Sequence, residues 1–385
     1  MRGGRIVAGG MAAVMLLNVA LFYDVLARLY QFRWQWMDFG GQWAICAYTL
    51  RGIDPYPLAG AELAPIAEIG TIRKDWGTSP YGCLLGNAFY PGFLTLEQAK
   101  IYFLIASAIA LLATGFFFCR RFARSKFGMM AAGLALCSYT AFGPIYSGNA
   151  GGIICCLLLI ACLICNSSPI AAGALLSLAM IKPQTALPIC FALLLMKKFK
   201  PLAIAAAIDL IGWLSVSIMV DRSMPELLDE FWHANIGGGS QFSGLFTLVF
   251  VDSPKSAMLA SMIFGFAFIF VLMRRLRGSD ELVRFYPACL TSAFFGYSYG
   301  NEYYLLLLPI VLLARLALTS DERPAQFAWL TALSFISTTP IAITYMIFEM
   351  IGRGFDGVMM LWITHTIFAL GLIAIGLAML RADFD

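Results

Sequence analysis

The chain has 385 residues, of which 61% are hydrophobic and only 12% are charged, whereas ordinary globular domains have about 45–50% and about 25%. With a mean hydropathy of +0.81, this composition excludes a soluble multidomain enzyme, a disordered regulator and a disulfide scaffold. The formal net charge of +4 excludes a nucleic-acid partner, because such partners need dense basic surfaces. The composition therefore predicts an integral membrane protein in contact with the lipid bilayer.

Apolar segments follow one another along most of the chain. A spanning helix needs about 20 mostly apolar residues, and a group of shorter segments is interrupted by Pro169 and Pro183. We predict an all-α polytopic membrane protein that forms a single integral membrane domain over residues 1–385. Its spans, about twelve in number, are predicted at residues 5–23, 99–118, 127–145, 150–165, 168–182, 184–197, 201–220, 256–273, 283–300, 302–318, 326–347 and 358–380.

Basic residues in the short loops set the predicted orientation. The basic clusters at 120–126 and 274–284 fall on one side of the membrane when the spans are counted, together with both chain termini. Because cytoplasmic loops are enriched in Lys and Arg, we predict that this side is cytoplasmic and that the protein crosses the inner (plasma) membrane several times. The extracytoplasmic side carries two long loops, residues 24–98, with short interfacial helices, and residues 221–243. Loops of this length are usually functional.

Asp38 lies in the first extracytoplasmic loop, among three tryptophan residues that fit an interfacial aromatic belt. A carboxylate in apolar surroundings is costly to ionise, so its pKa tends to rise. This property suits a general base that works near neutral pH. The structural alternative is that Asp38 pairs with Arg33 or caps a helix that starts at Gly40.

Lys182 stands at the outer end of one predicted span, and Pro183 opens the next. The functional interpretation is a fixed cation that binds a phosphate or another anion, since ionisable residues near the membrane are often functional. The alternative is a lysine that merely extends its ammonium group to the interface. Asn149 and Gln184 lie at the same predicted outer edge and are further candidates for substrate binding.

The remaining polar candidates lie in other outer segments. The Gly-rich stretch 237–239 follows a run of charged residues, and Gly-rich backbone can approach an anion closely. A flexible lid is an equal alternative. The candidates that we assign to substrate binding here are Arg222, His233, Gln241, Glu302, Tyr303 and Arg353.

The chain lacks the motifs of soluble nucleotide-binding proteins, with no GxxxxGK[ST] and no GxGxxG after a strand. It also lacks a His, Cys, Asp and Glu cluster with metal spacing, so we predict no metal and no cofactor. Cys162 and Cys165 form a CxxC inside an apolar run, which favours packing over redox chemistry. Cys46 and Cys83 share the long outer loop, and a disulfide between them stays an open question.

Several short motifs together resemble glycosyltransferase family 87, whose members are GT-C-type, polyprenyl-phosphate-mannose-dependent alpha-mannosyltransferases. Asp38 and the later stretch 52–56 are similar to the family's Asp and its G-x-[DN]-x-Y region. Gly148-Asn149 resembles a degenerate G-Q-x-N. The small-residue helix from Gly173 to Lys182-Pro183 matches the family's helix that ends in K-P, and residues 240–244 are similar to its N-Q-S-x-x-G. Residues 300–309 resemble a segment where the family usually has a His, but Glu302 and Tyr303 stand there instead.

The resemblance implies an inverting transfer on the extracytoplasmic face. Asp38 would deprotonate a hydroxyl of a lipid or glycan acceptor, and this hydroxyl would attack the anomeric carbon of a polyprenyl-phosphate sugar, either mannose or another hexose or pentose. The lipid phosphate would leave, and Lys182, Arg222, His233 and Arg353 are the outer cations available to neutralise it.

Two other classes of function stay open. A transporter or flippase for a lipid-linked or anionic substrate would move it without chemistry. Transporters often have two similar halves, whereas only one half of this chain has a long loop after its first helix. A non-catalytic membrane subunit that scaffolds an envelope-polymer complex is the third class.

Overall fold

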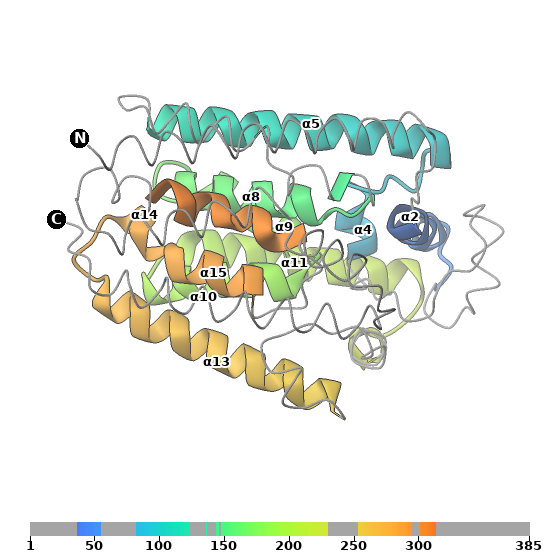
Figure 1. The fold of residues 1–385 in the computed structure, drawn as a ribbon. Helices are drawn as coiled ribbons and strands as arrows, with labels where there is room; N and C mark the ends of the chain where they lie inside the picture. The colour runs from blue at the N-terminus through green and yellow to red at the C-terminus, as the bar shows by residue number, and fades with distance from the viewer. Residues whose placement is uncertain are drawn as a thin grey trace, which may run out of the picture.

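A computed structural model describes residues 37–54, 82–122, 136, 144–145, 148–229, 253–294 and 301–312. Within these ranges the chain is helical and forms no β-strand, as predicted. Figure 1 shows the helices arranged as a bundle in which α5, α8, α10 and α13 run in similar directions. The elements are α2 (Met37–Leu50), α4 (Gly82–Gly86), α5 (Leu96–Arg121), α8 (Gly151–Ile164), α9 (Pro169–Ala179), α10 (Pro183–Leu195), α11 (Phe199–Met219), α13 (Pro254–Arg275), α14 (Glu281–Arg284), α15 (Tyr286–Phe294) and the 3-10 helix η2 (Asn301–Leu306).

The helices coincide with those predicted spans that fall within the described ranges. Helices α5, α8, α9, α10, α11 and α13 each lie on one predicted span, and α15 covers the first part of the span at 283–300. The 3-10 helix η2 and the helical residues 307–312 cover the start of the span at 302–318. The spans at 5–23, 326–347 and 358–380, and most of 127–145, lie outside the described residues, so the number of twelve stays a prediction.

Local sequence explains where several helices begin. Thr95 caps α5, since its hydroxyl accepts a hydrogen bond from the amide of Gln98, and the Gln98 side chain accepts one from the amide of Thr95. Pro169 and Pro183 are the first residues of α9 and α10. Proline suits this position because its φ is already helical and the first amide of a helix needs no partner within it.

Helix α8 forms the centre of the described bundle and is buried over most of its length. Helices α5 and α9 pack on it, η2 also contacts it, α11 packs on the far side of α9, and α15 joins α10 to η2. Gly173 permits the close contact of α9 with α11, since a Cβ at this position would lie 2.7 Å from the Ile204 Cβ and 2.7 Å from the Pro201 carbonyl oxygen.

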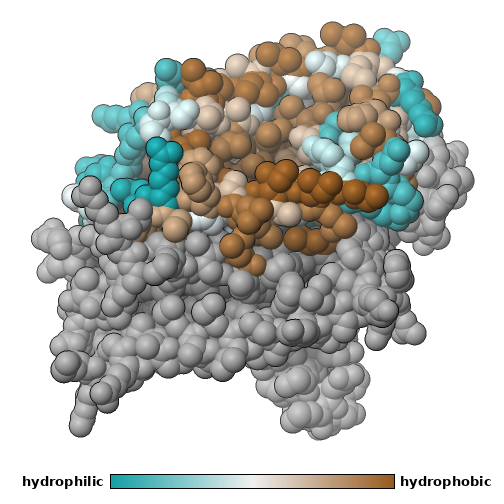
Figure 2. Space-filling view, turned by 90° about the horizontal axis from the view of Figure 1, so that it is seen from above, coloured by the Kyte–Doolittle hydropathy of each residue, from teal (hydrophilic) through white to brown (hydrophobic). Residues whose placement is uncertain are grey.

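The outer surface of the bundle is apolar between two polar ends. Figure 2 shows this belt on the face that carries α5, with hydrophilic residues gathered at either end. Helices α5 and α11 have 26 and 21 residues and are long and apolar enough to cross a membrane. Large exposed apolar side chains on these two helices include Ile101, Ile105, Ile109, Leu112, Phe116, Phe199, Leu210, Ile211, Leu214 and Ile218. Such a surface fits association with lipid.

One polar end joins four short connections, at residues 120–126, 166–168, 197–200 and 274–284, which the predicted spans place on the same side of the membrane. Arg121 at the end of α5 pairs with Asp280 at 3.2 Å, and Lys198 pairs with Glu281 at 2.7 Å. Asn166 joins the second of these pairs, because its side chain donates a hydrogen bond to Glu281 and accepts one from Lys198. This end includes α14 (Figure 1), and α2 and α4 lie at the opposite end.

Candidate functional site

The end of the bundle opposite α14 brings Lys182 and Asn149 together. Lys182 immediately precedes α10, and its Nζ donates a hydrogen bond of 2.8 Å to Asn149 Oδ1. The same oxygen accepts a hydrogen bond of 2.8 Å from the amide of Gly151, the first residue of α8. A fixed ammonium group therefore lies at the N-terminus of a helix, where the helix dipole is also positive, and the two effects together favour an anion.

Tyr90 connects this pair to the rest of the outer end. Its hydroxyl accepts a hydrogen bond of 2.7 Å from the amide of Ala150 and donates one of 3.4 Å to the carbonyl of Gly148. Gly148 has a φ of +70°, a conformation that favours glycine. The Tyr90 hydroxyl thus holds the backbone on both sides of Asn149.

Helix α2 packs against the same tyrosine and carries Asp38 in its first turn. The helix begins at Met37, three residues before the start at Gly40 that we considered from the sequence, so Asp38 lies within the helix. The next residue, Phe39, is fully buried. Its ring centroid lies 5.3 Å from that of Tyr90 and 5.3 Å from that of Phe103. The backbone of Asp38 is therefore adjacent to a packed aromatic cluster, and its side chain lies outside the described part.

The turn before α5 fixes α2 in place. A Cβ at Gly92 would lie only 2.4 Å from the amide nitrogen of Ala47 in α2, so only glycine permits this approach. The Trp43 indole donates a hydrogen bond of 3.2 Å to the carbonyl of Leu94, and Asn87 Oδ1 accepts one of 2.8 Å from the amide of Gly92. These contacts leave α2 little freedom to move relative to Tyr90.

Arg222 is paired with a carboxylate from the first outer loop. Its Nε lies 3.2 Å from Asp54 Oδ2, with the Asp54 side chain only 11% exposed. Two left-handed positions shape this contact, Gly52 with a φ of +72° and Asp221 with a φ of +53°. Arg222, predicted as a ligand for a phosphate, thus also balances a nearly buried carboxylate.

The structure describes the other predicted site residues only in part. Gln184 is half-buried in the first turn of α10. Glu302 and Tyr303 lie in η2, and their side chains lie outside the described part. The predicted ligands His233, Gln241 and Arg353 lie outside the described residues altogether.

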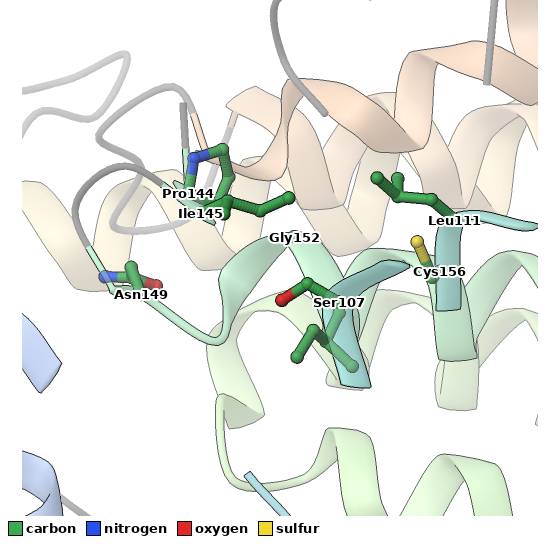
Figure 3. A pocket seen from close by; sticks show the side chains of 8 residues that line it. Ser107, Leu111, Pro144, Ile145, Asn149, Gly152 and Cys156 are labelled. Atoms are coloured by element: carbon green, nitrogen blue, oxygen red, sulfur yellow. The ribbon is translucent and has the colours of Figure 1, made fainter. Parts of the chain in front are cut away.

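A small pocket lies between α5 and α8, beside Asn149. Figure 3 shows Asn149 at one end of this pocket, Cys156 at the other, and Ser107 of α5 between them. The free space is about 10 Å³, enough for about one water molecule. This pocket is therefore too small for a sugar or a phosphate group.

The cysteines in the described part are packing residues. Cys162 and Cys165 are buried in the region of α8, and the Cys165 thiol donates a hydrogen bond to the Cys162 carbonyl. Among the described residues no group of three or more His, Cys, Asp and Glu could hold a metal ion. Cys46 is buried in α2, and the side chain of Cys83 lies outside the described part.

Two residues of this end were not among the predicted ligands. Asp54 lies in the stretch 52–56 that resembles the G-x-[DN]-x-Y motif, which is the signal that could have found it. Tyr90 lies in an aromatic segment, residues 87–93, whose sequence does not indicate which backbone groups the hydroxyl reaches.

The comparison with known families identifies the chain. The model of glycosyltransferase family 87 matches residues 81–298, a range that includes Tyr90, Asn149, Lys182 and Arg222. No curated protein and no solved structure matches the chain. The family match covers more than half of the chain and agrees with the helical, apolar architecture of the described residues, so this protein is a membrane-associated enzyme that belongs to glycosyltransferase family 87.

Proposed function

We propose that this glycosyltransferase moves a sugar from a polyprenyl-phosphate donor to a lipid or glycan acceptor, with inversion at the anomeric carbon. The reaction takes place at the end of the bundle that holds α2, Asn149 and Lys182. This end faces the extracytoplasmic side of the inner membrane in the proposed topology, because the opposite end carries the basic loops.

The hydrogen bond between Lys182 and Asn149 at the start of α8 is the observation that carries the proposal. Lys182 is half-buried, and the amide oxygen of Asn149 accepts a hydrogen bond from its ammonium group. This contact orients the ammonium group at the start of α8, where a cation can bind an incoming phosphate.

Asp38 acts as the general base in this proposal. Its carboxylate takes the proton from the acceptor hydroxyl as the hydroxyl oxygen forms a bond with the anomeric carbon. The bond between that carbon and the phosphate oxygen breaks on the opposite face of the sugar. The polyprenyl phosphate leaves with one more negative charge than it had as a diester.

Lys182 stabilises that developing charge. A preorganised cation lowers the barrier most when it is positioned where charge appears in the transition state. No covalent sugar–enzyme intermediate is needed, because positioning of the two substrates and charge stabilisation provide the main contributions. Neither a metal nor another cofactor enters the scheme.

The test is transfer by the purified chain in nanodiscs, with a panel of radiolabelled polyprenyl-phosphate sugars and measurement of released polyprenyl phosphate. Asp38→Asn should lower turnover by about 10²–10⁴-fold, and Lys182→Met by about 10²–10³-fold. Matched controls at the same end are Asp229→Asn and Lys100→Met. Asp229 is exposed, and Lys100 forms a surface ion pair with Glu97, so both controls should stay near the wild-type rate.

The contrary outcomes are distinct from one another. Near-wild-type turnover in Asp38→Asn would exclude Asp38 as the base. Movement of labelled donor across liposomes without release of polyprenyl phosphate would favour a flippase. Transfer only from soluble nucleotide sugars would exclude the lipid-linked donor.

A further inference from the structure

The buried hydroxyl of Tyr90 lies between the two halves of the candidate site. Tyr90 is 4% exposed and belongs to the turn between α4 and α5. Its hydroxyl contacts the residues immediately before and after Asn149, at Gly148 and Ala150. Asn149 is in turn the residue that accepts the hydrogen bond from Lys182.

The ring of Tyr90 is held as firmly as its hydroxyl. It stacks on Phe103 of α5 at 5.9 Å between centroids and packs edge-on against Phe39 of α2 at 5.3 Å. Phe39 and Phe103 are both fully buried. Because buried aromatic clusters are closely packed and resist displacement, the ring fixes the position of the hydroxyl relative to α2.

We propose that Tyr90 is a positioning residue that sets the Asn149–Lys182 pair at a fixed distance from Asp38 on α2. This inference rests on the proposed function, in which Asp38 and Lys182 act on the same donor and acceptor. The residue touches neither substrate. It acts through the turn that carries Asn149.

The inverting transfer requires a fixed distance between Asp38 and Lys182. The base and the cation act on opposite sides of the anomeric carbon, so their separation must match the line of attack. A displacement of about 1 Å between such groups costs about 10²-fold in rate. Asn149 lies in the turn before α8, and without the hydrogen bonds to the Tyr90 hydroxyl this turn can shift relative to α2.

The test is Tyr90→Phe, which keeps the ring and removes the hydroxyl. We expect kcat to fall about tenfold, with KM for the donor changing by less than about threefold, because the ground-state contacts remain. Tyr102→Phe is the matched control. It also removes a hydroxyl that donates to a backbone carbonyl, that of Ala88 at 3.1 Å, but from an exposed side chain, and it should leave kcat unchanged.

A double variant separates positioning from a general loss of stability. If Tyr90 acts through Asn149, then Tyr90→Phe should lower kcat by less than about twofold when Asn149→Ala is already present. Full additivity of the two losses would overturn the proposal. Equal kcat values for Tyr90→Phe and Tyr102→Phe would also overturn it.

Hydrogen exchange gives a readout that needs no turnover. The Ala150 amide donates to Tyr90, so Tyr90→Phe should speed its exchange about fivefold or more, and Tyr102→Phe should not. An unchanged exchange rate of the Ala150 amide in Tyr90→Phe would overturn the positioning role of Tyr90, even if no donor tested supports sugar transfer. If the Ala150 amide exchanges faster in Tyr90→Phe but the wild-type protein transfers no sugar, the proposed function is overturned. The catalytic role of Tyr90 is then overturned with it.

Discussion

Lys182 owes its place to the proline that follows it. Pro183 starts α10, and a residue before proline is disfavoured in the helical region of backbone conformation. Lys182 accordingly has φ −114° and ψ 79°, so it lies in the connection between α9 and α10. The Lys-Pro pair thus keeps the ammonium group at the end of the bundle, within reach of Asn149.

Glu226 gives a pH-dependent prediction at the outer end. Its carboxylate accepts hydrogen bonds of 2.9 Å and 2.8 Å from the amide and hydroxyl of Ser223, and these bonds lower the pKa of Glu226 below its ordinary value of 4.5. A lowered pKa in the folded state stabilises it above about pH 4.5, and the stabilisation is lost as the pH falls through the lower folded value. Glu226→Gln should therefore lower the unfolding temperature at neutral pH, and this difference should shrink in acid.

Ser223 provides the control for that measurement. Ser223→Ala removes the hydroxyl donor, so it should reduce the same pH-dependent difference in thermal unfolding scans between pH 3 and pH 7, the range about the ordinary pKa of a glutamate. A Glu226→Gln effect of equal size at both ends of this range would mean that the charge of the carboxylate is irrelevant.

At the scale of helices, the contact between α9 and α11 fixes the position of the helix that precedes Lys182. Gly173 and Ser177 lie one turn apart on α9, on the side that faces α11. Ser177 donates a hydrogen bond of 2.6 Å to Asp209 of α11, which satisfies a polar group within an apolar helix. Since α9 ends at Ala179, three residues before Lys182, this contact also fixes the position of Lys182 along the length of the bundle.

Gly173→Val tests that contact. The added side chain would meet the Ile204 Cβ and the Pro201 carbonyl, so we expect the free energy of unfolding to fall by about 1–3 kcal/mol. Gly278→Val is the matched control, because a Cβ at Gly278 has no atom within 4 Å, and it should change stability by less than about 0.5 kcal/mol. Thermal unfolding in detergent micelles measures both. Equal stability of the two variants would show that α9 and α11 can separate without cost.

At the scale of the whole molecule, the ion pairs of the described residues lie at the two ends, and apolar surface covers the middle. One end joins Arg121 to Asp280 and Lys198 to Glu281. The other joins Arg222 to Asp54 and Lys182 to Asn149. A bilayer requires this arrangement, because charged groups are costly in its hydrocarbon core.

Cysteine labelling tests which end faces the cytoplasm. Asp229→Cys lies in the helical segment 224–229 that follows α11 at the outer end, and Gly278→Cys lies between α13 and α14, at the end with the basic loops. A membrane-impermeant maleimide added to intact cells should label Asp229→Cys above the level of the unmodified chain, and should label Gly278→Cys only after permeabilisation. The reverse pattern would invert the topology and place the candidate site in the cytoplasm.

The sequence by itself determined the class of protein, the family and the positions of the longer helices, α5, α8, α9, α10, α11 and α13. These properties depend on composition, on apolar runs and on local signals such as Pro169, Pro183 and the Thr95 cap, which act within a few residues. The same local information found Asp38 and Lys182 as candidates, because a charged residue is conspicuous beside an apolar segment.

Only the tertiary structure decided which of these residues meet. Helix α8 is apolar on every side, so its sequence does not indicate which face turns toward α5 and which toward α9. The contacts of Asn149 with Lys182, of Arg222 with Asp54 and of Tyr90 with Ala150 each join distant segments. They depend on how whole helices pack against one another, a property that small residues such as Gly92 and Gly173 permit but that no local pattern encodes.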